Sequence, residues 1–151
     1  MMKFENSVTI NQPVNKVFDF VTNLKNNTQW QTNILELEMT SEGRFELGST
    51  YRCVNRFMGQ RLETEVVITD YVADRTCSFR ITSGLVTGES NFFFEAVDGA
   101  TQFTTTAILD LRYFKFGKIP VKRKISKQLK NDMLQLKRIL EKGSQPFFQT
   151  K

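Results

Sequence analysis

The sequence predicts an α+β fold in which a curved antiparallel sheet holds one long C-terminal helix. Residues 51–112 form a nearly continuous run of β-patterned sequence, and short helical segments precede it. An amphipathic segment follows this run and ends near Gly143. A sheet wrapped around a single helix would have a concave face, and such a face can hold a hydrophobic molecule.

The N-terminal part of the chain predicts a strand, two short helices and a second strand. Apolar and polar residues alternate over residues 4–10, which is typical of a strand with one buried face. Pro13 follows at a position that suits the first turn of a helix, and residues 14–21 carry an apolar stripe at helical spacing. Asparagines end this helix, a second short helix or turn carries Trp30, and residues 35–40 alternate again as a strand.

The segment around Gly59 predicts the first hairpin of the central sheet. Gly59 and Gln60 at the turn centre would give a two-residue type II′ connection. This register places apolar and neutral residues on one face and charged residues on the other, a sorting that a one-residue slip would destroy. The predicted pairs are Tyr51–Ile68, Cys53–Val66, Asn55–Thr64 and Phe57–Leu62 on the inner face, and Arg56–Glu63 with Arg52 near Glu65 outside.

Asp98 and Gly99 predict a second hairpin, of type I′. Its inner pairs are Ser90–Ala107, Phe92–Thr105 and Phe94–Phe103, and its outer pairs are Asn91–Thr106, Phe93–Thr104 and Glu95–Gln102. Between the hairpins, residues 77–82 alternate as a further strand whose orientation the pattern leaves open. If this strand were reversed, Arg80 would become a cation inside the fold, and Asp70 shares this uncertainty.

The C-terminal segment predicts an amphipathic helix of about five turns. Its apolar residues recur at spacings of four, four, three and four at Ile125, Leu129, Met133, Leu136 and Leu140. We expect residues 1–143 to form a single domain and residues 144–151 to form a flexible tail.

Composition excludes several kinds of site. The chain has no histidine, which removes His-based nucleophilic catalysis and His-ligated zinc or haem. Cys53 and Cys77 lie in predicted strands without metal-type spacing, so we expect buried free thiols. We therefore expect no cofactor and no metal, and the lack of a signal-type or membrane-spanning segment predicts a cytoplasmic protein.

Charge is concentrated in the C-terminal part of the chain. Residues 113–151 contain 11 Lys and Arg against 2 Asp and Glu, whereas residues 1–112 contain 10 against 14. The preferred interpretation is a solvated helix face; the alternative is contact with an anionic membrane through Tyr113, Phe114, Phe116 and nearby lysines. No nucleic-acid partner is expected, because the basic residues circle the helix and no recognised motif is present.

The order of these elements resembles the helix-grip superfamily. The residues that carry the resemblance are Ile10-Asn11-Gln12-Pro13-Val14-Asn15-Lys16-Val17-Phe18, Trp30, Leu47-Gly48-Ser49-Thr50-Tyr51 and Gly99-Ala100-Thr101. The last replaces the Gly-Thr that the family often shows. The superfamily includes START lipid-transfer domains, the birch-pollen-allergen fold, polyketide cyclase/dehydrase-like proteins and coenzyme Q-binding proteins. The resemblance implies seven antiparallel strands around the last helix, two short helices after the first strand, and a cavity between sheet and helix.

The predicted cavity is mostly apolar and contains a few polar groups. Its predicted lining is Trp30, Tyr51, Asn55, Phe57, Thr64, Val66, Phe92, Phe94, Phe103, Thr105, Leu129 and Met133. Asn55 is the most informative of these residues, because an inward amide costs about 1–3 kcal/mol unless it finds a partner. The leading hypothesis is binding or transport of a lipid, isoprenoid or polyketide-like molecule. The alternative is a cyclase/dehydratase-like enzyme using Tyr51, Asn55 and either Arg80 or Asp70; no catalytic residue is assigned.

Overall fold

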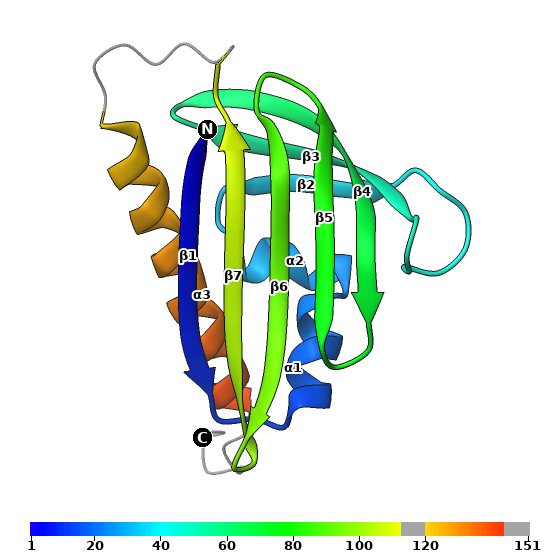
Figure 1. The fold of residues 1–151 in the computed structure, drawn as a ribbon, viewed down its shortest axis with the longest axis vertical. Helices are drawn as coiled ribbons and strands as arrows, with labels where there is room; N and C mark the ends of the chain where they lie inside the picture. The colour runs from blue at the N-terminus through cyan, green and yellow to red at the C-terminus, as the bar shows by residue number, and fades with distance from the viewer. Residues whose placement is uncertain (113–119, 144–151) are drawn as a thin grey trace.

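The described residues form seven antiparallel strands and three helices, which confirms the predicted fold class (Figure 1). The computed structural model describes residues 1–112 and 120–143. The sheet order is β1-β7-β6-β5-β4-β3-β2. The elements are β1 (Met2–Ile10), α1 (Val14–Val21), α2 (Leu24–Trp30), β2 (Ile34–Met39), β3 (Thr50–Phe57), β4 (Gln60–Val72), β5 (Thr76–Ser83), β6 (Thr87–Val97), β7 (Ala100–Asp110) and α3 (Val121–Gly143).

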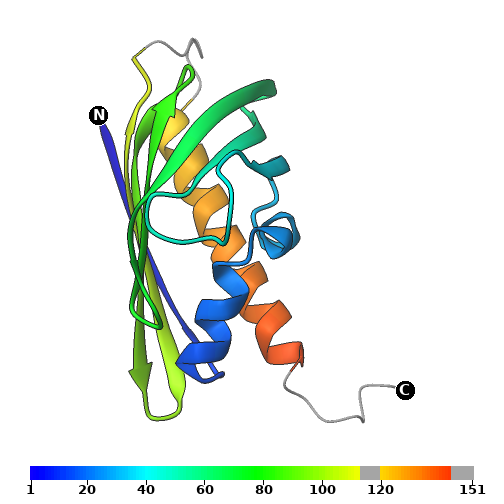
Figure 2. The ribbon, with the colours of Figure 1, turned by 90° about the vertical axis from the view of Figure 1, so that its right-hand side faces the viewer.

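All three helices lie on the same side of the sheet (Figure 2). Strands β3 and β4 curl over this side, α3 runs along its length, and α1 and α2 cover the remaining part. The inner face of the sheet is therefore enclosed between strands and helices, as the helix-grip resemblance implies. None of the helices in the described part of the chain is long and apolar enough to cross a membrane.

Local sequence explains where the two short helices begin. Pro13 occupies the N-cap of α1 in an extended conformation, and α1 buries Val17, Phe18 and Val21. Asn23 caps α2, because its side chain accepts a hydrogen bond of 3.1 Å from the Lys25 backbone N–H. The asparagine that the sequence suggested as a helix breaker therefore also starts the next helix.

The first hairpin differs from its prediction by two residues. Met58 and Gly59 form the turn centre with positive φ values of 52° and 82°, so the turn is type I′ rather than II′. Phe57 pairs with Gln60 and Asn55 with Leu62. Because side chains alternate with a period of two, a shift by two residues keeps each residue on its predicted face.

The outer ion pairs change with this register. Arg56 lies opposite Arg61, so the predicted Arg56–Glu63 pair is wrong. Arg52 does lie opposite Glu65, but its guanidinium contacts Glu63 at 3.3 Å instead. Exposed pairs of this kind contribute about 0–1 kcal/mol each, so they do not decide the register.

The structure also shows how β6 pairs with β7 and which face of β5 points inward. Asp98 and Gly99 have φ values of 49° and 84°, and all six predicted pairs between β6 and β7 are confirmed. Cys77 is buried, whereas Arg80 is exposed and contacts Glu89 at 3.6 Å. The reversed strand that would make Arg80 an interior cation is therefore wrong.

Strand β2 contains a bulge that the alternation did not predict. Ile34 pairs with Asn55 and Glu36 with Val54, which leaves Leu35 as an extra residue. Leu35 is consequently 43% exposed, although the sequence placed it on the apolar face. Leu37 remains packed against the core.

Two apolar clusters fill the interior. The larger cluster joins α1, α2 and the second half of α3 to the middle of the sheet, and Phe103 and Leu136 are fully buried in it. The smaller cluster joins the first half of α3 to the ends of β1 and β4 and includes Phe4, Leu62 and Ile125. The predicted tail, residues 144–151, and the predicted membrane-contact residues Tyr113, Phe114 and Phe116 lie outside the described residues.

Candidate ligand-binding site

The structure brings most of the predicted lining residues into the larger cluster. The predicted lining residues that belong to this cluster are Trp30, Tyr51, Val66, Phe92, Phe94, Phe103 and Met133. Phe57 and Leu129 instead pack against the smaller cluster. The three polar predictions, Asn55, Thr64 and Thr105, belong to neither apolar cluster, although each lies on the inner face.

Aromatic rings meet at the centre of the larger cluster. The ring centroid of Phe103 lies 5.0 Å from that of Phe94 and 5.4 Å from that of Phe92. Trp30 lies 6.1 Å from both Phe92 and Phe103. These distances fall within the range of favourable aromatic pairs, so the rings stabilise the interior by packing against one another.

Three buried polar side-chain atoms have no hydrogen-bond partner among the described residues. They are Nε1 of Trp30, Oδ1 of Asn27 and Oδ1 of Asn55. The other end of the Asn55 amide makes a weak 3.9 Å contact with the Cys53 sulfur. An unsatisfied buried polar group costs about 1–3 kcal/mol, so these atoms mark places where a ligand or water would stabilise the protein.

Sequence reasoning missed Asn27 as a site residue. Asn27 and Trp30 are three residues apart on α2, and both are buried. This spacing places them next to each other on one helix face. The spacing was visible in the sequence, but nothing local distinguished a buried asparagine from one that ends or caps a helix.

Asp132 is a second residue that sequence reasoning missed. It is 4% exposed on the inner side of α3, and its Oδ1 accepts a hydrogen bond of 3.1 Å from the Thr32 hydroxyl. This contact fastens the α2–β2 connection to α3. Burial raises the pKa of Asp132, although hydrogen bonds from Thr32 oppose the shift. An acid inside the apolar stripe of a lysine-rich helix was the available signal.

Asp132→Asn is expected to become more stable relative to the wild type as the pH rises. The folded protein keeps a proton on Asp132 above the ordinary pKa of 3.8, where the unfolded chain has lost it. Stability therefore falls as pH rises through this window, and the amide removes the loss while keeping an oxygen for Thr32. Urea unfolding at several values from about pH 3.5 to pH 7 measures the difference between the two proteins.

Glu141→Gln provides a control of opposite sign. Burial would raise the pKa of Glu141, but hydrogen bonds from Lys137 and the Asn11 backbone outweigh it and lower the pKa. Its stabilising contribution is present above the ordinary pKa and is lost as the pH falls. This variant should therefore lose stability relative to the wild type as pH rises, and equal behaviour of the two variants would contradict the assignment.

The remaining inner titratable groups are not poised to act as bases or nucleophiles. Burial, followed by the nearby Cys53 and Cys77, raises the pKa of Tyr51 far above its usual value. Burial also raises the pKa of Cys53, and burial together with Asp70 raises the pKa of Cys77 to about 12. All three groups stay protonated at neutral pH, so none is a base or a thiolate nucleophile. The described residues contain no group of three His, Cys, Asp or Glu side chains that would hold a metal ion.

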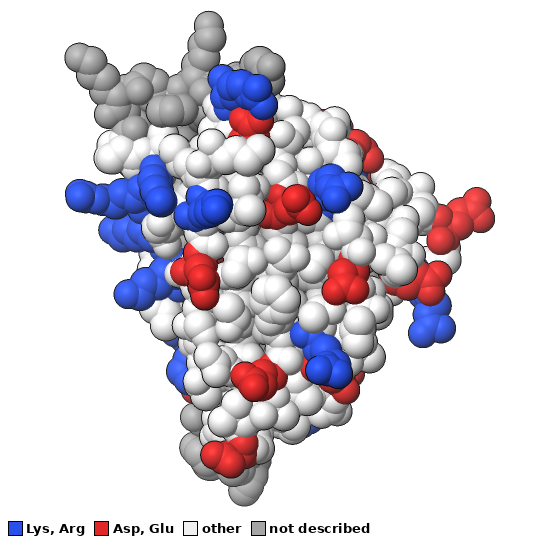
Figure 3. Space-filling view, viewed as in Figure 1, with Lys and Arg blue, Asp and Glu red and all other residues white. Residues whose placement is uncertain are grey.

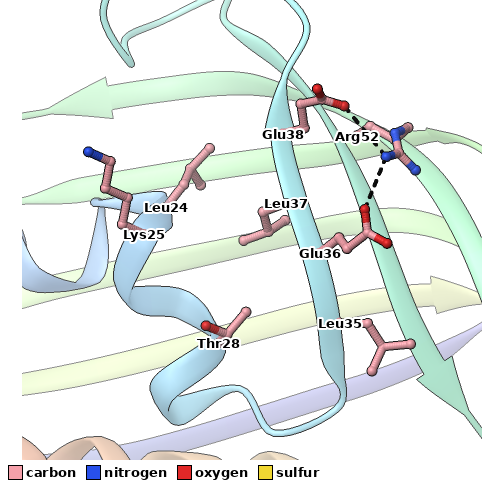
Figure 4. A pocket seen from close by; sticks show the side chains of 8 residues that line it. All are labelled: Leu24, Lys25, Thr28, Leu35, Glu36, Leu37, Glu38 and Arg52. Atoms are coloured by element: carbon pink, nitrogen blue, oxygen red, sulfur yellow. Dashed lines mark hydrogen bonds and ion pairs between the residues drawn. The ribbon is translucent and has the colours of Figure 1, made fainter.

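A groove opens on the surface between α2 and the edge strand β2 (Figure 4). It has a volume of about 490 Å³ and is lined by Leu24, Lys25, Thr28, Leu35, Glu36, Leu37, Glu38 and Arg52. On its charged rim, Arg52 contacts Glu36 at 3.4 Å and Glu38 at 3.5 Å. Leu24 and Leu37 line the groove and also pack against the larger cluster, so they separate solvent from the interior.

Comparison with known proteins agrees with the fold. Residues 1–141 match the protein family described as "Polyketide cyclase / dehydrase and lipid transport". No curated protein matches the sequence significantly. The protein TTHA0849 from Thermus thermophilus has a TM-score of 0.79 at 15% identity, over 95% of this chain and 100% of that chain.

Two further solved structures have the same fold at low identity. A START superfamily protein from Mycobacterium smegmatis has a TM-score of 0.70 at 12% identity, over 93% of this chain and 95% of its own. A conserved protein from Geobacillus kaustophilus has a TM-score of 0.75 at 13% identity, over 94% of this chain and 97% of that chain. The likeness to the START superfamily protein confirms the predicted helix-grip fold.

Proposed function

Because the chain belongs to the polyketide cyclase/dehydrase and lipid transport family, we propose that it binds a hydrophobic or amphipathic small molecule. The proposed site lies between the inner face of the sheet and α3. The observation that carries the proposal is the Trp30 indole, which is 3% exposed among apolar rings while its N–H lacks a partner among the described residues. A ligand with an apolar body and one polar group would meet both features.

The same arrangement suggests how a ligand reaches the interior. The groove between α2 and β2 is separated from the larger cluster by Leu24 and Leu37, which are both half-buried. Leu24 is the first residue of α2, and β2 is an edge strand held by one neighbour. Movement of these two side chains would connect the groove to the rings around Trp30.

Thr105→Phe is expected to weaken binding of a neutral hydrophobic probe. Thr105 is half-buried on the inner face of β7 opposite Phe92, so a larger ring there would occupy the proposed ligand space. We expect the dissociation constant of N-phenyl-1-naphthylamine to rise roughly tenfold or more, which corresponds to about 1.4 kcal/mol. Fluorescence titration of the probe measures this change.

Thr104→Phe is the matched control for this experiment. Thr104 lies on the same strand but on the opposite face, where its hydroxyl is 3.2 Å from the Ser7 hydroxyl. The control should bind the probe like the wild type, and thermal melting should show that both variants fold. Equal weakening in both variants would place the probe elsewhere, and a wild type without saturable binding would refute the proposed function.

A cyclase/dehydratase-like reaction is the second candidate, and the family description is its support. Few of the side chains proposed for such a reaction are placed to act as an acid, a base or an interior cation. Tyr51 is held protonated, Arg80 lies on the outer face, and Asp70 is exposed and accepts a hydrogen bond from Thr76. A reaction at this site would therefore depend on shaping the substrate rather than on a strong acid or base. Binding without chemistry fits the residues better.

We further propose contact with an anionic membrane through the outer face of α3. Arg123, Lys127, Lys130 and Arg138 recur at helical spacing and are all exposed, with the 42% exposed Leu134 among them. These four residues share one outward face of α3. Lys122, Lys124 and Lys142 are exposed as well, so basic residues also lie on either side of this face, as the sequence suggested. Figure 3 shows Lys and Arg gathered along the edge formed by α3.

The two acidic residues of α3 do not offset this positive charge at the surface. Asp132 is buried, and Glu141 binds Lys137.

Reversing two of these charges is expected to reduce membrane binding. Each basic residue near an anionic surface contributes about 1 kcal/mol, so Lys127→Glu with Lys130→Glu should lower vesicle partitioning roughly tenfold or more. Co-sedimentation with phosphatidylserine-containing vesicles at low salt measures this partitioning. Arg44→Glu with Arg75→Glu makes the same change in net charge outside α3 and is the control. Equal loss in both double variants would contradict docking through α3.

We also propose a cytoplasmic location, because both cysteines are buried free thiols. Proteins of oxidising compartments more often pair their cysteines.

A further inference from the structure

The buried polar atoms of α2 favour one chemical class of ligand. We propose that the interior binds a neutral hydrophobic alcohol or phenol, whose oxygen accepts the Trp30 N–H. This inference rests on the proposed function, because it specifies the ligand of the same site.

The Trp30 indole requires a hydrogen-bond acceptor. An indole N–H is only a donor, and this one has no partner among the described residues. The side chain is 97% buried, since its exposed fraction is 3%. Its ring lies against Phe92 and Phe103, so the N–H belongs to the apolar interior rather than to the surface.

Asn27 adds a requirement for a donor. Its Oδ1 is buried without a partner in the described part of the chain, while its Nδ2 donates a hydrogen bond of 2.9 Å to Oε1 of Gln31. Asn27 and Trp30 are three residues apart on α2, so their side chains leave the helix on the same face. We infer that one hydroxyl of the ligand meets both polar atoms. A hydroxyl accepts from the indole and donates to the amide oxygen, whereas an ether or ketone does only the first.

The charges of the interior exclude an ionised head group there. No Lys or Arg side chain in the described part of the chain is buried. The two that are half-buried already have acidic partners, Arg52 with Glu63 at 3.3 Å and Lys137 with Glu141 at 2.7 Å. A carboxylate or phosphate taken inside would have no counter-ion, and an unpaired buried ion is strongly unfavourable.

A cationic head group is also disfavoured. Asp132 is the only buried charged residue among those described, and its Oδ1 is occupied by the Thr32 hydroxyl at 3.1 Å. Burial raises its pKa, because a buried site disfavours the charged carboxylate, although hydrogen bonds from Thr32 and Gln128 oppose the shift. A neutral hydroxyl therefore fits this interior better than an amine or an acid.

A series of ten-carbon molecules that differ only in the head group tests the inference. Competition of 1-decanol, decyl methyl ether, decanoate and decylamine against N-phenyl-1-naphthylamine at pH 7.4 gives relative affinities. Because Trp30 is the only tryptophan in the chain, its fluorescence reports binding at the site without labelling. We expect 1-decanol to bind roughly tenfold or more tightly than the acid and the amine, and more tightly than the ether.

Trp30→Phe supplies the matched variant, because it keeps an aromatic ring and removes the N–H. We expect it to weaken binding of 1-decanol roughly three- to tenfold more than binding of the probe, the effect of one neutral hydrogen bond, since the probe offers no oxygen acceptor. Binding of decanoate or decylamine as tightly as the alcohol would overturn this inference and leave the proposed function intact. Equal weakening of alcohol and probe in Trp30→Phe would overturn it too, by showing that the indole only packs. Failure of the wild type to bind even the probe would overturn both.

Discussion

Phe103→Ala is expected to destabilise the protein by about 3–5 kcal/mol. Phe103 is fully buried in the larger cluster and lies against Phe92, Phe94 and Trp30. Its removal would leave a cavity whose walls belong to β6 and α2, and strands paired on both sides cannot close such a gap. Urea unfolding monitored by circular dichroism measures the change in the free energy of unfolding.

Phe93→Ala tests whether the loss of stability depends on burial of the side chain rather than on removal of a phenylalanine. Phe93 is next to Phe92 in sequence but points to the outer face, where it is 42% exposed. Its truncation should cost less than about 1 kcal/mol. Similar losses for Phe93 and Phe103 would show that the inner face of β7 does not form the core.

Gly88→Ala is expected to destabilise the protein by roughly 2–4 kcal/mol, through a clash with the neighbouring strand. A Cβ atom at Gly88 would lie 2.0 Å from the backbone oxygen of Ile108 and 3.0 Å from Cα of Leu109. Backbone atoms cannot rotate away as a side chain can, so β6 and β7 would have to separate locally. The φ of +151° at Gly88 adds strain for any residue with a side chain.

Gly59→Ala distinguishes the clash from the backbone strain. Gly59 also has a positive φ, +82°, but a Cβ atom there would meet nothing within 4 Å. Its substitution should cost only the left-handed conformation, about 1 kcal/mol. Hydrogen exchange of the β6 and β7 amides should increase in Gly88→Ala alone, and equal unfolding free energies for the two variants would count against the close strand approach.

The fold could be predicted because several local signals agree. Asp98-Gly99 fixes the second hairpin, since few residues besides glycine adopt the conformation that the turn needs. The first hairpin was predicted two residues out of register, because Met58 adopts a positive φ that its residue type disfavours. The inner and outer faces were still correct, because strand periodicity survives a shift of two residues.

The predicted site residues were brought together only in part. Trp30 and the phenylalanines of β6 and β7 meet in one cluster, as alternation along each strand predicts. Phe57 and Leu129 lie in the other cluster, because hairpin register and helix position decide the distance along the sheet. Asn27 was missed as a site residue, since nothing local distinguishes a buried asparagine from a helix-capping one.

The sequence by itself determined which residues share a face in most strands and helices, because periods of 2 in strands and 3.6 in helices are local properties of the chain. It also determined that histidine chemistry is absent. Only the tertiary structure decided that Arg80 lies outside, that Leu35 occupies a bulge, and that buried polar atoms on α2 and β3 lack partners among the described residues. These features depend on how strands pair and where helices pack, and contacts between residues distant in sequence leave little trace in local patterns.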